Sequence, residues 1–258
     1  ILHMSRFFIN LYFLFFVFLA IGQSKPIDLN PKDSVEHKQS YGLSLGLDLS
    51  RIITSSLADN YSGFEVVADY RLTQNLYIAA ELGNEEKTRQ EDLFNFTTSG
   101  SYLKVGVNKN NYANWYGERN LIYLGGRLAF STFENTLNNY QYFDTNRYWN
   151  TEDFANGSDV SEKFSGLSAT WLEAVFGTKV ELFSNIYMGA SIRLGIILAQ
   201  KEDDRFPNLW IPGFNKVTDD SRFGVGYNYS ISYYLPLYKK KNKVKKKIEQ
   251  AEKKVEEL

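Results

Sequence analysis

The feature that most constrains this chain is the alternation of apolar and polar residues in eight separate segments. In the first segment, every second residue from Tyr41 to Leu49 is apolar, and the residues between them are Gly, Ser or Asp. A period of two places successive side chains on opposite faces, which is the pattern of a strand with one apolar face. The same pattern recurs at 64–71, 76–82, 102–107, 122–130, 171–182, 186–198 and 222–235. The sequence therefore predicts an all-β protein.

The lengths of the connections indicate which all-β architecture to expect. The connections at 73–75 and 183–185 are short, and the one at 108–119 is intermediate. Those after the first, third, fifth and seventh segments are long, and the longest covers 132–168. Short turns at one end and long loops at the other are typical of an outer-membrane barrel with an even number of strands. We predict an eight-stranded antiparallel up-and-down transmembrane β-barrel. If 92–107 formed two strands, the count would be ten.

Charged residues gather on the polar faces of the predicted strands and are nearly absent from the apolar faces. An eight-stranded barrel has a lumen that side chains fill, and buried charges there need partners. We therefore predict a charge-paired barrel interior made of six acids and six bases: Asp48, Glu65, Asp69, Arg71, Glu81, Lys104, Arg127, Glu173, Lys179, Glu181, Arg193 and Arg222.

The N-terminal residues have the features of a secretory signal. Arg6 is followed by the stretch 7–21, which is apolar apart from Asn10, and small residues follow at Ala20 and Gly22. The stretch is shorter than the roughly 20 residues of a membrane-spanning helix, although a retained anchor is the alternative. We predict a signal peptide at 1–24, a flexible periplasmic lead-in at 25–39 and the barrel at 40–238.

The C-terminal residues 239–258 have a different composition, with nine Lys and four Glu. Their apolar residues recur at intervals of four and three, as on one face of a helix: Val244, Ile248, Ala251 and Val255. We predict a short basic amphipathic helix in the periplasm that docks a partner protein or anionic lipid headgroups. The alternative is a solvated tail.

The longest predicted loop is rich in aromatic residues, which offer large contact areas at low entropic cost. Its candidate partner-binding residues are Tyr140, Tyr142, Phe143, Tyr148, Trp149 and Phe154. The alternative is that these rings pack together as a lid on the barrel. The acids at 202–204 and 219–220 lack the spacing of a calcium loop, so we predict a solvated rim with no metal and no cofactor.

Composition limits the chemistry available to the chain. It contains no cysteine and two histidines, of which His3 falls within the predicted signal and His37 precedes the first strand. Activation of a serine nucleophile by imidazole would need a histidine on the barrel, so we predict that the protein is not an enzyme. The formal net charge of −1 gives no basic footprint for nucleic acid.

The order of segments, the loop asymmetry and the stretch NLIYLGGR at 120–127 resemble the small OmpA- and OmpX-like transmembrane barrels. Over about 40–238, the chain is similar to a Bacteroidota family of small outer-membrane barrels of unknown function. The resemblance implies a Gram-negative outer membrane with both termini periplasmic, and it implies no catalytic residues. The chain differs from many such barrels because twenty residues follow Tyr238.

These patterns favour a non-enzymatic outer-membrane barrel. Its expected surroundings are the lipid bilayer and other envelope proteins, bound through extracellular loops or the C-terminal helix as a structural or interaction subunit. The alternative is a narrow channel for ions or small solutes. A third possibility, a lipid-modifying enzyme, is disfavoured because the predicted barrel has no histidine.

Overall fold

A computed structural model describes residues 38–112, 119–143, 154–156, 161–217 and 222–241. The predicted signal peptide, most of the lead-in and the apolar residues of the predicted C-terminal helix lie outside these ranges. The described elements are β1 (Lys38–Asp48), α2 (Leu49–Leu57), β2 (Tyr61–Arg71), β3 (Leu76–Gln90), β4 (Phe94–Asn110), β5 (Leu121–Phe143), β6 (Phe154–Asn156), β7 (Glu162–Phe183), β8 (Ile186–Lys201), β9 (Trp210–Ile211), β10 (Asn215–Lys216) and β11 (Phe223–Lys241).

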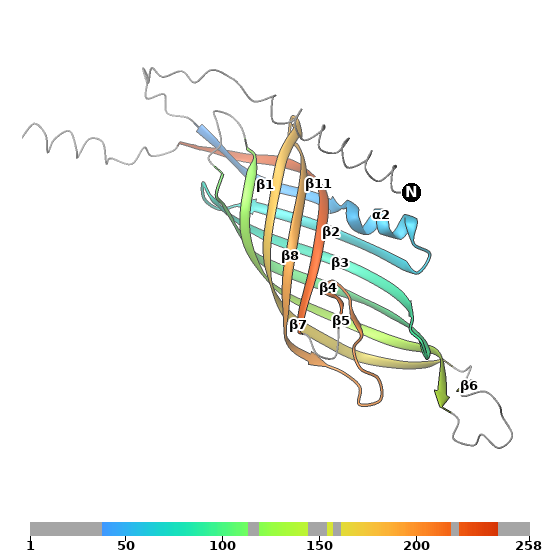
Figure 1. Ribbon diagram of the computed structural model, residues 1–258. Helices are drawn as coiled ribbons and strands as arrows, with labels where there is room; N and C mark the ends of the chain where they lie inside the picture. The colour runs from blue at the N-terminus through green and yellow to red at the C-terminus, as the bar shows by residue number, and fades with distance from the viewer. Residues whose placement is uncertain (1–37, 113–118, 144–153, 157–160, 218–221, 242–258) are drawn as a thin grey trace, which may run out of the picture. The chain divides into compact units, whose positions relative to one another are not determined.

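Eight long strands close into an antiparallel up-and-down barrel, as predicted (Figure 1). Each of them pairs with the next long strand along the chain, and β11 returns to lie beside β1. Within the described residues, β6 adds a short pairing to the end of β5, and β9 and β10 form a separate two-stranded hairpin. Within the segment 92–107, residues 94–107 form part of the single strand β4, so the ten-stranded alternative is wrong.

The strands at one end of the barrel are longer than the sequence pattern predicts. The predicted connections at 83–101 and 132–168 largely continue as paired strands, up to Gln90↔Asn95 and Leu137↔Glu162. We call these continuations of β3, β4, β5 and β7 the strand extension (84–90, 94–101, 132–143 and 162–170). At the opposite end, β11 continues past Tyr238 to Lys241, and the Tyr238 ring stacks on Tyr41 of β1 at 5.4 Å. The predicted helix therefore cannot begin at residue 239.

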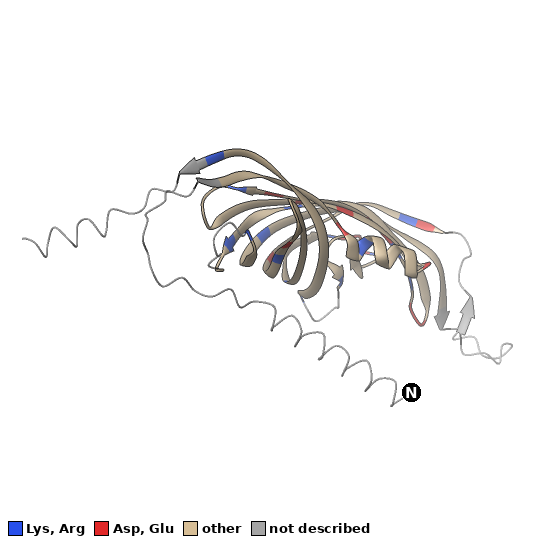
Figure 2. Ribbon diagram, turned by 90° about the horizontal axis from the view of Figure 1, so that it is seen from above, with Lys and Arg blue, Asp and Glu red and all other residues tan. Residues whose placement is uncertain are grey.

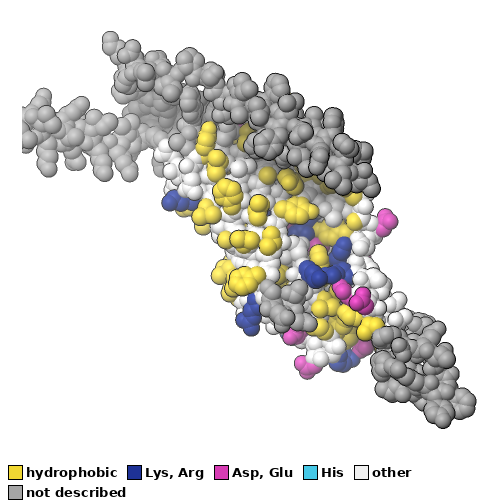
Figure 3. Space-filling model, viewed as in Figure 1, with side chains coloured by type: hydrophobic (Ala, Val, Ile, Leu, Met, Phe, Trp, Pro, Cys, Tyr) yellow, Lys and Arg dark blue, Asp and Glu magenta, His cyan; other side chains and the backbone are white. Residues whose placement is uncertain are grey.

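The outward face of the barrel is apolar on all eight strands. Figure 3 shows apolar side chains on the face of the barrel that is in view. One exposed residue from each strand, in chain order, illustrates the belt: Leu45, Phe64, Leu82, Leu103, Leu128, Phe176, Ile192 and Val225. We call this surface the apolar belt. Soluble proteins rarely leave so large a contiguous apolar surface exposed, because burying it away from water is favourable.

The outward face of the strand extension is polar instead. The Nδ2 group of Asn84 donates to Oγ of Ser101 at 3.0 Å, and the Thr88 and Thr97 hydroxyls lie 2.8 Å apart. Amide and hydroxyl groups on neighbouring strands thus replace the leucines of the belt. The outward surface changes from apolar to polar where the extension begins.

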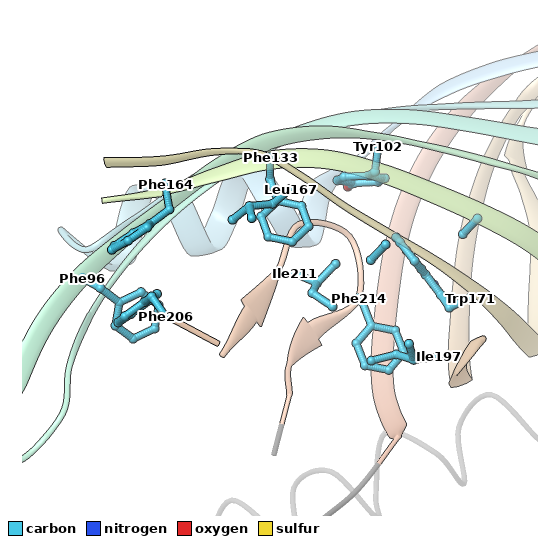
Figure 4. Packing of buried hydrophobic residues seen from close by; sticks show 12 residues of the cluster. Phe96, Tyr102, Phe133, Phe164, Leu167, Trp171, Ile197, Phe206, Ile211 and Phe214 are labelled. Atoms are coloured by element: carbon cyan, nitrogen blue, oxygen red, sulfur yellow. The ribbon is translucent and has the colours of Figure 1, made fainter. Parts of the chain in front are cut away.

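The inward face of the extension carries the main hydrophobic core (Figure 4). The connection between β8 and β11 folds back onto this face, and we call its residues 202–217 the inner loop. Phe206 of the inner loop stacks on Phe164 at 5.5 Å, and Phe214 meets the edge of Trp171 at 5.6 Å. Ile211 is completely buried among these rings. The aromatic residues on the inward face of the strand extension therefore pack against the inner loop and hold it in place.

The helix α2 interrupts the alternation that the sequence predicts up to Ser50. Asp48 ends β1 and caps the helix, because its Oδ1 accepts hydrogen bonds from the Ser50 N–H at 2.8 Å and the Ser50 hydroxyl at 2.6 Å. The helix ends at Leu57, and the N–H of the next residue, Ala58, donates to the carbonyl of Thr54 at 3.0 Å. Among the described residues, no helix has the length and apolar character needed to cross a membrane.

Two neighbouring glycines provide a test of the register between β4 and β5. A Cβ on Gly106 would lie 1.8 Å from the carbonyl oxygen of Gly126, whereas the nearest atom to a Cβ on Gly126 is 3.9 Å away. We expect Gly106→Ala to lower the free energy of unfolding by about 1–3 kcal/mol, because backbone must shift. Gly126→Ala serves as the matched control and should change it little. Denaturant-induced unfolding of both variants measures this, and equal stabilities would contradict the register.

Candidate functional site in the barrel interior

Arg193 of β8 lies at the centre of a buried network of charges. Its guanidinium forms an ion pair with Glu81 of β3 and approaches Glu65 of β2 at 3.7 Å and Glu173 of β7 at 3.8 Å. From β5, Nε of Arg127 donates to the other oxygen of Glu81 at 3.2 Å. All five side chains are buried, and Figure 2 shows basic and acidic positions on the strands of the barrel. Residues far apart in the chain thus meet at the barrel axis because each occupies an inward position of its strand.

Lys104 of β4 joins this network to the inner loop. Its Nζ donates to Oε1 of Glu173 at 2.9 Å and to the carbonyl oxygen of Gly213 at 2.9 Å. The indole N–H of Trp171 donates to the same Glu173 oxygen at 2.6 Å. The ammonium also lies 5.3 Å from the centre of the Tyr102 ring, a distance suited to a cation–π contact. A fully buried lysine is therefore held by a carboxylate, a carbonyl and an aromatic ring.

Uncharged side chains supply further hydrogen bonds to the network, including both oxygens of the Glu65 carboxylate. The Tyr102 hydroxyl donates to Oε2 of Glu65 at 2.5 Å, and Asn228 of β11 donates to Oε1 at 3.1 Å. Nη1 of Arg127 donates to the side-chain oxygen of Asn108 at 2.9 Å. Such partners offset part of the cost of removing charges from water.

A second group of charges connects α2 to the extension. Nη1 of Arg51 lies 3.1 Å from Glu85 and donates to the Tyr61 hydroxyl at 2.9 Å. Burial alone would lower the pKa of Arg51, but Glu85 together with Tyr102, Glu65 and Tyr61 outweighs this effect and raises the pKa above its ordinary value. The other Glu85 oxygen accepts the Gly213 N–H at 2.8 Å. Arg51 and Lys104 thus hold the inner loop from two sides through Glu85 and Gly213.

A third group lies toward the end of the barrel that holds the short turns. Nζ of Lys179 forms an ion pair with Asp69 at 2.5 Å and donates to the Ser44 hydroxyl at 3.2 Å. The Arg71 guanidinium donates to the backbone carbonyls of Ser40 and Gln74 at 3.0 and 2.9 Å. Arg71 therefore joins the start of β1 to the β2–β3 turn.

The structure brings together most of the charges predicted for the interior. Glu65, Glu81, Lys104, Arg127, Glu173 and Arg193 form the central network, while Asp69 pairs with Lys179 and Arg71 binds backbone carbonyls. The remaining three predicted members, Asp48, Glu181 and Arg222, have other surroundings.

Arg222 is a wrong prediction, because it is exposed and precedes β11, whose pairing with β8 begins at Phe223↔Ile196. Glu181 is half-buried, and its carboxylate accepts the Asn185 N–H at 3.0 Å across the β7–β8 turn. Asp48 is buried and caps α2, with Arg51 at 3.8 Å. Asp48 thus lies in the interior as predicted, where it lines a cavity with Glu65 and Arg193, whereas the alternation does not extend to Glu181 and Arg222 at the strand ends.

The sequence pattern does not predict several members of the network. Glu85 continues the inward positions of β3 beyond the predicted strand, so recognising the longer strand would have revealed it. Arg51 belongs to a helix where a loop was expected. The uncharged partners Tyr102, Asn108, Trp171 and Asn228 carry no charge pattern by which sequence alone distinguishes them.

The predicted partner-binding residues fall mostly at the end of the extension or beyond the described residues. Tyr140 lies in β5 and is 40% exposed. Tyr142 and Phe143 also belong to β5, and Phe143 pairs through its backbone with Phe154 of β6. The others lie outside the described residues: Tyr148, Trp149, Val244, Ile248, Ala251 and Val255.

The interior leaves little free space for a ligand. A cavity beside Arg51, Glu65 and Arg193 has room for about one water molecule. In the part of the chain that the structure describes, no three His, Cys, Asp or Glu side chains are arranged so that they could hold a metal ion. The carboxylates of Glu65 and Glu81 both face Arg193, which favours a structural role for them over shared acid–base chemistry.

Comparison with known families and structures gives the following relationships. Residues 4–240 match the family described as "Domain of unknown function (DUF6048)", and the chain belongs to this family. No curated protein sequence matches the chain. The chain is similar to Ail, the attachment invasion locus protein of Yersinia pestis, at 11% identity and a TM-score of 0.38, covering 77% of this chain and 99% of Ail. It is also similar to Acinetobacter baumannii CarO2, at 10% identity and a TM-score of 0.38, covering 77% of this chain and 100% of CarO2.

The central network predicts that replacing a buried arginine destabilises the protein much more than replacing an exposed one. We expect Arg193→Met to lower the free energy of unfolding by about 3–5 kcal/mol, because it leaves buried carboxylates without their cation. Arg205→Met is the control, since Arg205 pairs with Asp203 and Glu162 on the exposed surface of the inner loop. Solvent screens that pair, so little change is expected. Denaturant titrations of both variants measure the difference, and a similarly small loss in both would contradict the proposed role of Arg193.

Proposed function

We propose that this member of the DUF6048 family is a non-enzymatic outer-membrane barrel that acts as a structural or interaction subunit with other envelope proteins. The observation that carries the proposal is the apolar belt on all eight strands, combined with charges that face inward. Water favours the opposite arrangement, whereas a bilayer favours this one. Closure of the barrel also satisfies the backbone hydrogen bonds that lipid cannot.

The proposed orientation follows from the asymmetry of the two ends. The short β2–β3 and β7–β8 turns lie at the same end as the start of β1 and the end of β11, and this end is assigned to the periplasm. The strand extension then points out of the cell. An origin in Bacteroidota, which the resemblance implies, stays a prediction.

The filled interior favours this proposal over a channel. Arg193, Lys104 and Glu81 occupy the lumen with their partners, and the inner loop covers the end beneath the extension. An ion path would require charged side chains to exchange buried partners for solvent. The lipid-modifying alternative receives no support from the described residues, which include no histidine.

The extension is well suited to hold a contact surface at a fixed position. Its inward face packs around Phe96 and Phe206, whose ring centres are 5.5 Å apart, and its outward face is polar. Tyr140 lies near the end of this sheet and is 40% exposed. A partner that binds there would meet a surface set beyond the membrane. Docking through the C-terminal helix stays a prediction, because its apolar residues lie outside the described ranges.

Photo-crosslinking in the native envelope tests the interaction. A photoreactive amino acid replaces Tyr140, and the control variant carries it at Phe176, an exposed residue of the apolar belt. We expect a discrete protein adduct at position 140 and no protein adduct at position 176, where lipid surrounds the side chain. A second sample truncated after Lys241 shows whether the tail is needed for the contact. Absence of an adduct at 140 in both samples would contradict an interaction through the extension.

A further inference from the structure

The helix α2 presents its apolar side chains away from the barrel. Ile53 is 52% exposed and Leu57 is 82% exposed, although the helix is only nine residues long. With Leu49, they recur every four residues and therefore form one stripe. A helix that borders water has the reverse arrangement, with its apolar stripe against the protein. The orientation of α2 calls for an apolar medium on its outer side.

Polar contacts to the barrel fix this orientation. Ser55 accepts the Gly63 N–H of β2 at 2.8 Å, and its own hydroxyl lies 2.8 Å from the Arg51 carbonyl to which it donates. Arg51 reaches inward to Tyr61 and Glu85. With Asp48 capping the first turn, the inner side of α2 is held along its length. The helix cannot turn its apolar stripe inward without breaking these bonds.

The stripe continues the apolar belt. On β1, Leu45 and Leu47 are exposed outward positions, and Leu49 of α2 comes two residues later. Phe64 of the adjacent strand β2 is exposed as well. On β3, β4 and β5, the next outward residues past the belt are polar instead, at Asn84, Ser101 and Thr132. Among the described strands β1, β3, β4 and β5, the apolar surface continues past the belt only after β1. The helix α2 forms this continuation.

We propose that α2 is an interfacial helix that inserts Ile53 and Leu57 among the acyl chains of the outer leaflet. This inference rests on the proposed membrane location of the barrel. The occupant is lipid because the stripe is continuous with the lipid-facing belt and carries no charge that would recognise a protein or a headgroup. Helices of this kind bury their apolar face about 5–10 Å into the boundary between headgroups and acyl chains. On one side of the barrel, α2 thereby sets how deep the protein sits, while the polar extension stays outside.

Spin labelling tests this assignment directly. The chain has no cysteine, so each cysteine variant carries a single nitroxide. The test variants are Ile53→Cys and Leu57→Cys, with Leu128→Cys in the belt and Ser101→Cys on the extension as controls. The full chain is reconstituted in vesicles of phosphatidylethanolamine and phosphatidylglycerol. Collision rates with oxygen, which partitions into lipid, and with a water-soluble nickel chelate are then measured for each label.

We expect the oxygen-to-nickel ratio at positions 53 and 57 to be several-fold higher than at 101 and close to that at 128. A ratio at 53 and 57 equal to that at 101, with a high ratio at 128, would overturn the interfacial helix and leave the membrane barrel intact. Low access of both reagents at 53 and 57 would mean that protein covers α2, which also overturns it. A low ratio at all four positions would contradict the membrane location itself.

Discussion

The ion pairs around Arg193 are the interaction on which the rest of the structure depends. Three bases, Lys104, Arg127 and Arg193, meet three acids, Glu65, Glu81 and Glu173, so this central group is balanced. In the narrow lumen of an eight-stranded barrel, an unpaired charge would be very costly, whereas a pair with further hydrogen bonds is tolerated. Because the charged side chains occupy the inward positions of the strands, the outward positions can all be apolar. The same alternation thus fills the lumen with charged side chains and leaves an apolar outer surface.

The network also determines how the open end is covered. Gly213 donates its N–H to Glu85, which pairs with Arg51 of α2, and its carbonyl accepts from Lys104 of the central network. One residue of the inner loop therefore binds both groups of charges. Gly213 has a φ of +83°, and a Cβ there would lie 2.5 Å from the Tyr102 ring, so both backbone conformation and space favour glycine. Next to it, Phe214 enters the aromatic core. The charged interior therefore adjoins the hydrophobic core at Gly213 and Phe214.

The sequence predicts the strands and much of the interior because both depend on one alternating pattern. Inward acids and bases at Glu81 or Arg193 stand out against the outward leucines and isoleucines. The alternation does not predict the extension because both of its faces carry polar residues, as Thr97 and Ser99 outward and Thr98 inward show. The alternation does not predict α2 because its first residue, Leu49, continues the apolar pattern of β1. Contacts such as Arg51 with Glu85 join distant segments, so no local pattern reveals them.

The most direct measurement is the conductance of the full chain in a planar bilayer. Correct insertion is established beforehand by resistance of the barrel to added protease and by its heat-dependent mobility on a gel. A lumen closed by paired charges and the inner loop predicts a bilayer whose current stays at the baseline over the accessible range of voltage. Reproducible unitary current steps from the inserted protein would contradict the closed interior and would favour a channel.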